Sequence, residues 1–60
     1  MDPVCSAAAS AYIESITGGA TEAAATEAAS QAYISALGAN PDFDSNSSCG
    51  KAAEAYIAAF

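Results

Sequence analysis

Alanine occupies 18 of the 60 positions, and this excess constrains the fold more than any other feature of the sequence. Val, Ile, Leu and Phe together number only 8, and with a net charge of −6 that share would by itself be typical of a disordered chain. Alanine changes this expectation because it is the strongest helix former and loses no side-chain entropy on ordering. The sequence therefore predicts an all-α protein.

Residues with strong start and stop preferences mark the first two helices. Asp2, which is followed by proline, can accept hydrogen bonds from the first free N–H groups of a helix. Gly18-Gly19 stops that helix, because glycine enters the left-handed conformation at low cost. Thr21 then caps a second helix, which Gly38 ends. The predicted helices cover about residues 3–17 and 21–37.

The segment that follows is rich in Asn, Asp and Ser and predicts a loop over residues 38–48. Asn40-Pro41 initiates a turn, and Phe43 is expected to anchor the loop to the core. Ser47 or Ser48 caps the third helix. That helix is predicted over about residues 49–60, in a single helical domain that spans residues 1–60.

A shift of 44 positions superimposes residues 5–13 on residues 49–57, so that a Cys, a Tyr and an Ile coincide in register. The first and third helices are then equivalent elements. Two architectures satisfy this: a small three-helix up-down-up bundle, or a fragment of a two-helix tandem repeat of about 44 residues. Alanine-rich sequence also matches itself readily without duplication. On the first helix, Cys5, Ala9, Ile13 and Ile16 form the expected buried stripe.

Cys5 and Cys49 stand at the starts of two helices that should run parallel, so both thiols are expected at the same end of the bundle. A disulfide between them would close a long loop and stabilise a fold with few large side chains by about 3 to 4 kcal/mol. A reduced buried pair and a bridge to another unit or chain remain open. Two thiols without histidine do not suit a metal, and we expect no cofactor.

Tyr12, Tyr33 and Tyr56 each precede an isoleucine that we expect to be buried. The tyrosines should therefore lie at the edge of the apolar face with their hydroxyls directed outward. Their ordinary role is boundary packing, and the alternative is that they form an assembly surface between molecules.

Asn46-Ser47-Ser48 is an N-glycosylation sequence in the predicted loop, and with two cysteines it favours a secreted or extracellular protein. No apolar signal segment precedes Asp2. We therefore expect either a mature fragment with an added initiator Met1 or the native start of an intracellular protein.

Several classes of function are excluded by the charged residues. One Lys and no Arg cannot neutralise a nucleic-acid backbone, and an anionic membrane surface would repel the chain. There is no histidine, and no nucleophile, base and orienting group can be assembled, so an enzyme is not expected.

Alanine-rich, serine-containing helices punctuated by tyrosine, in a tandem unit, resemble the repeat modules of silk-like extracellular structural proteins. The resemblance is one of composition and covers most of the chain. It implies a non-enzymatic extracellular module that self-assembles into a fibre, coat or matrix, as a homo-oligomer. The alternative is a small secreted, disulfide-stapled recognition or signalling protein. An ice-binding helix is a third candidate, but Thr17, Thr21 and Thr26 lack a regular eleven-residue spacing.

Overall fold

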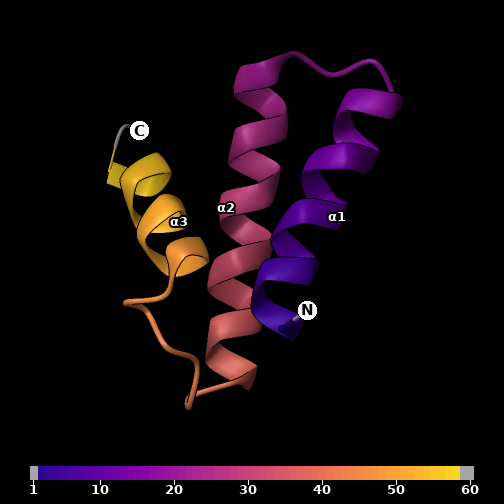
Figure 1. The fold of residues 1–60 in the computed structure, drawn as a ribbon. Helices are drawn as coiled ribbons and strands as arrows, with labels where there is room; N and C mark the ends of the chain where they lie inside the picture. The colour runs from indigo at the N-terminus through magenta and orange to yellow at the C-terminus, as the bar shows by residue number, and fades with distance from the viewer. Residues whose placement is uncertain (1, 59–60) are drawn as a thin grey trace.

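The computed structural model describes residues 2–58 and contains three helices (Figure 1). They are α1 at Pro3–Thr17, α2 at Glu22–Ala39 and α3 at Ser48–Ala58. Within residues 2–58 there is no β-strand, so the all-α prediction is confirmed. In Figure 1, α1 rises, α2 returns beside it and α3 rises again, in the predicted up-down-up order. The last two residues of the predicted third helix lie outside the described range.

Both ends of α1 follow from the residues that bound it. The Asp2 carboxylate accepts hydrogen bonds from the backbone N–H groups of Val4 and Cys5 at 2.8 and 3.1 Å. At the other end, Gly19 has a φ of 94°, in the left-handed region that favours glycine. The N–H of Ala20 then closes onto a carbonyl of the last turn at 2.9 Å, which completes a Schellman ending.

The predicted end of α2 at Gly38 is wrong, because the helix continues to its C-cap at Asn40. The Asn40 side-chain amide donates to the carbonyl of Ala36 at 2.8 Å, and its backbone N–H donates to the carbonyl of Leu37 at 3.1 Å. One asparagine thus satisfies two carbonyl groups that the helix end leaves free. Gly38 therefore lies inside the helix and does not end it.

The starts of α2 and α3 are capped as expected. The Thr21 hydroxyl accepts from the N–H of Ala24 at 3.1 Å, and the Ser47 hydroxyl accepts from the N–H of Gly50 at 3.1 Å. Ser47 rather than Ser48 is therefore the cap of the third helix. The helix begins one residue earlier than predicted, and the loop is shorter than predicted at both ends.

The buried hydrophobic residues of the described chain are Val4, Ala25 and Tyr33. The Phe43 ring meets the Tyr33 ring edge to face, with centroids 5.8 Å apart and an interplanar angle of 81°. Phe43 thus anchors the loop between α2 and α3 to the core, as predicted.

The predicted buried stripe on α1 is wrong. Ile13 is 62 % exposed, Ile16 is 40 % exposed, Ala9 is also exposed and only Cys5 is partly buried. The less exposed face is made of small side chains and one tyrosine. Its residues are Val4, Ala7, Ala8, Ala11, Tyr12 and Ser15. Because alanines on α1 and α2 let the two backbones approach closely, the bulky isoleucines are directed away from the contact.

Helix α3 is the least embedded of the three. It packs against α2 much more sparsely than α1 does. Gly50, in the first turn of α3, is buried against the turn that precedes the helix. A Cβ atom at this position would collide with the Ser45 backbone. The position of α3 thus depends strongly on its first turn, which also carries Cys49.

Candidate functional site

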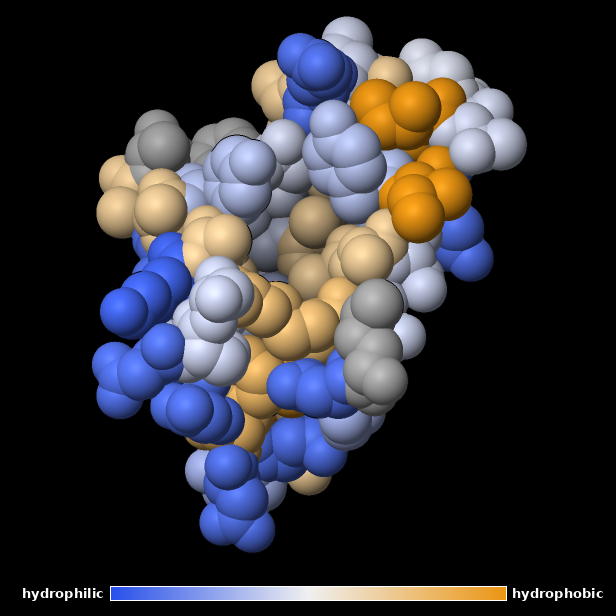
Figure 2. Space-filling model, viewed as in Figure 1, coloured by the Kyte–Doolittle hydropathy of each residue, from blue (hydrophilic) through white to orange (hydrophobic). Residues whose placement is uncertain are grey.

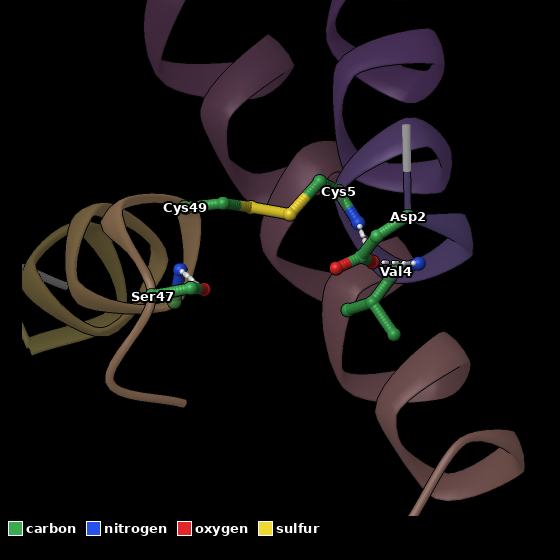
Figure 3. The surroundings of a disulfide bond; sticks show 6 residues. Asp2, Val4, Cys5, Ser47 and Cys49 are labelled. Atoms are coloured by element: carbon green, nitrogen blue, oxygen red, sulfur yellow. Dashed lines mark hydrogen bonds between the residues drawn. A yellow bond between two sulfur atoms is a disulfide. The ribbon is translucent and has the colours of Figure 1, made fainter. Parts of the chain in front are cut away.

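A disulfide joins Cys5 in the first turn of α1 to Cys49 in the first turn of α3 (Figure 3). The two Cα atoms lie 6.2 Å apart and the residues are 44 positions apart in the chain. Asp2 and Ser47 cap the same two helix starts, so each cysteine sits on a hydrogen-bonded turn. The predicted pairing is therefore present within one chain, and no cysteine of the described residues is free.

Beyond the disulfide, α1 and α3 form the two walls of a groove whose floor is α2. Its volume is about 630 Å³. Each wall presents residues at helical spacing of three and four. The lining residues are Cys5, Ala8, Ala9, Tyr12 and Ile13 from α1, Glu22, Thr26, Ala29, Ser30 and Tyr33 from α2, and Cys49, Ala52, Ala53 and Tyr56 from α3.

The two walls are built from equivalent residues. Adding 44 to the number of a residue on the α1 wall gives a residue on the α3 wall in four cases: Cys5 and Cys49, Ala8 and Ala52, Ala9 and Ala53, Tyr12 and Tyr56. Residues that match at an offset of 44 in the sequence thus face one another across the groove. A surface of two alanines, one tyrosine and one half-cystine is used twice, once on each side.

Large apolar side chains remain exposed around and beyond the groove. Ile13 at 62 % and Tyr56 at 61 % belong to the groove lining, whereas Ile34 at 56 % lies on α2 outside that lining. Figure 2 shows apolar surface down the middle of this face, and the most hydrophobic residues gather over the upper part of α1. The charged side chains lie mainly elsewhere, since Glu22 alone carries a charge among the lining residues.

The predicted assembly tyrosines do not behave alike. Tyr12 is half-buried and Tyr56 is exposed, and the groove brings these two side chains together from α1 and α3. The edge position predicted for Tyr33 is wrong, because the residue is only 1 % exposed. The prediction assumed that the following isoleucine was buried, but Ile34 is turned outward.

Within the described residues, the buried hydroxyl of Tyr33 has no hydrogen-bond partner. Burial raises the pKa of this hydroxyl above its ordinary value of 10.0. The negative charge of Glu54, a hydrogen-bonding interaction with the Glu54 side chain and the negative charge of Asp2 raise the pKa further, in that order. The Glu54 carboxylate thus lies close enough to interact with the hydroxyl, but the pair does not meet the distance and angle of a full hydrogen bond. The proton stays on Tyr33 at neutral pH.

Asn46 lies in an exposed turn just before α3, as the sequence predicts. Asp2, Asp42 and Asp44 line a second hollow, near the start of α1 and the loop. No group of three or more potential ligands is placed to hold a metal ion within residues 2–58. No helix in that range has both the length and the apolar character needed to cross a bilayer.

Sequence reasoning missed the exposed isoleucines and the groove that Ile13 borders. The positions of the alanines in the sequence could have indicated both features. Ala8 and Ala9 are separated from Ala52 and Ala53 by 44 residues, the same offset that separates the two cysteines. Helices that contact through alanine faces leave their larger residues outside. Comparison of the chain with protein-family models, curated proteins and solved structures gave no match.

Proposed function

We propose that the protein is a non-enzymatic extracellular structural module that self-associates into a fibre, coat or matrix. The observation that carries this proposal is the amount of large apolar surface that the fold leaves outside its core. Ile13 and Tyr56 are exposed at the groove, and Ile34 is exposed on α2 outside it. If Ile34 makes a contact apart from the groove, one copy can meet more than one neighbour, which an open assembly requires.

The groove is suited to contact with a second copy by its shape. Its interior is lined by alanines, whereas Tyr12, Ile13 and Tyr56 supply bulky side chains on its two walls. A bulky side chain of one copy can therefore fill the space over the small residues of another. Since Glu22 is the one charged residue of the lining, such a contact would bury little charge.

Charge sets the conditions under which association should occur. Each copy carries a net charge of −6 and a single basic residue, so two copies repel one another at long range. Salt screens that repulsion and leaves the apolar contact intact. Association that strengthens with salt is therefore the signature of this function.

The disulfide is compatible with an extracellular protein. The alanine-rich composition resembles that of silk-like structural repeats, and the equivalence of the α1 and α3 walls supports a repeat unit of about 44 residues. In this account, the disulfide holds the α3 wall in place because the packing of α3 on α2 is sparse.

Sedimentation velocity and negative-stain microscopy on oxidised protein, repeated after reduction, test the proposal. Large regular assemblies that dissociate on reduction would support it, since loss of the disulfide releases one groove wall. A compact monomer at every concentration would contradict it.

A second candidate is a secreted recognition protein that binds another helix in the groove. The overall negative charge favours this candidate, because a basic amphipathic helix could place its apolar side between α1 and α3 and its cationic flanks outside. This function requires a stable monomer. The same sedimentation experiment therefore separates the two candidates.

A further inference from the structure

We infer that Asn46 is an N-glycosylation site, used when the chain passes through an oxidising secretory compartment. The inference rests on the extracellular location proposed above but concerns a part of the molecule that self-association does not use. The acceptor is the side-chain amide of Asn46, and the hydroxyl two residues later, on Ser48, completes the recognition sequence.

The turn that carries Asn46 is held by other residues. The Asp44 carbonyl accepts from the N–H of Ser47 at 3.1 Å, and the Asp44 carboxylate accepts from the backbone N–H of Asn46 at 2.9 Å. Among the described residues, no hydrogen bond engages the side-chain amide of Asn46. The residue is exposed, so this amide is presented to solvent on an ordered turn.

The serine of the recognition sequence is equally available. Ser48 is exposed at the first position of α3, whereas the capping hydrogen bond to Gly50 is made by the Ser47 hydroxyl. The division of roles means that the hydroxyl required for glycosylation is not the one that the helix needs. A glycan on Asn46 is therefore compatible with the folded start of α3.

Asn40 offers an internal contrast in the same loop. Its side-chain amide donates to the carbonyl of Ala36 and is engaged in ending α2. It is followed by proline and then by Asp42, so it lacks both the required middle residue and the hydroxyl. A glycan is expected at Asn46 alone.

The position of Asn46 leaves the groove open. No residue of the loop between α2 and α3 contributes to the groove lining. In Figure 1 this loop runs from the lower end of α2 up to the start of α3. A glycan on Asn46 would be attached to this exposed loop, outside the residues that line the groove.

The reaction transfers an oligosaccharide from a diphospholipid donor. The Asn46 side-chain nitrogen forms a bond to the anomeric carbon of the first N-acetylglucosamine and loses a proton. The bond between that carbon and the diphosphate oxygen breaks, and the diphospholipid leaves with the electron pair. No oxidant or reductant is consumed.

The test is secretion of the full chain from eukaryotic cells behind a cleavable signal peptide, followed by intact mass before and after treatment with a peptide-N-glycosidase. We expect a glycan mass that the enzyme removes, leaving aspartic acid at position 46. S48A should abolish the modification while keeping Asn46 and the Ser47 cap, and S48T should retain it.

The result that would overturn the inference is secreted wild-type chain with an intact disulfide and no glycan. Modification that persists in S48A would overturn it as well. Because the signal peptide is supplied, failure of the test would not bear on self-association. Sedimentation, conversely, does not depend on Asn46.

Discussion

Tyr12 and Tyr56 face the same groove from equivalent positions on α1 and α3, 44 residues apart in the chain. Cys5 and Cys49 are related by the same offset, are covalently joined and also line that groove. Matching side chains thus line the two sides of the groove, and the disulfide joins one matching pair. We therefore expect the stability of the protein to depend on how firmly α3 is held, and its association to depend on contacts made at the groove.

Replacement of both cysteines by serine, or reduction, should release α3. In the chain-entropy model, a bridge across this separation stabilises the folded state by about 4 kcal/mol. Because α1 packs on α2 extensively and α3 does not, the loss should be concentrated in α3. Hydrogen exchange should show faster amide exchange in residues 48–58 than in α1 and α2. Equal acceleration throughout the chain would contradict the inferred role of the bridge.

Two glycine-to-alanine changes should have opposite effects on stability. Gly38 lies inside α2, and an added Cβ meets no atom within 4 Å, so G38A should raise the free energy of unfolding by about 0.5 to 1 kcal/mol. In G50A the Cβ would collide with the Ser45 backbone, and we expect a loss of about 1 to 3 kcal/mol. Urea unfolding of both variants measures the two effects. Stabilisation by G50A would show that α3 is not seated as described.

Y33F should stabilise the protein or leave its stability unchanged. The Tyr33 hydroxyl is buried without a partner, so its removal eliminates an unmet desolvation cost of about 1 kcal/mol or more. Y56F is the matched control, since that ring is exposed and should respond little. A clear loss of stability in Y33F, as seen in urea unfolding, would mean that the hydroxyl has a partner.

The stability of the protein should fall at alkaline pH through Tyr33. Its pKa is raised in the folded state by burial and then by Glu54. Folding therefore favours the neutral hydroxyl over the ionised form. That contribution to the free energy of unfolding is fully present below the unfolded pKa of about 10 and is lost as the pH rises through the higher folded value. Unfolding experiments across this range should show a steeper fall in the wild type than in Y33F. Identical profiles would contradict the assignment.

The sequence predicted the helices well because their boundaries depend on local chemistry. The Asp2, Thr21 and Ser47 caps and the Gly18-Gly19 ending act within one turn of the chain, and each was identifiable from neighbouring residues. Gly38 was misjudged because a side chain two residues later, that of Asn40, ends the helix instead.

Which face of each helix is buried could not be read in the same way. Hydrophobicity placed Ile13 and Ile34 inside, but much of the less exposed surface of α1 and α2 is alanine, and alanine is so frequent on both helices that it does not mark one face in the sequence. Tyr33 is buried against Phe43, which lies outside its helix in the loop that follows α2. Such choices are made by tertiary packing, which the periodicity of a single helix does not contain.

Sedimentation equilibrium of the oxidised protein tests the central claim most directly, over a series of concentrations at low and at high salt. We compare the wild type with I13A, which shortens a groove residue, and with I16A, the same change on α1 outside the groove lining. Alanine preserves the helix in both. We expect the wild type to associate, and its association to strengthen with salt. Association should be weaker in I13A and should change less in I16A. A wild-type protein that remains monomeric at every concentration and salt level would contradict it.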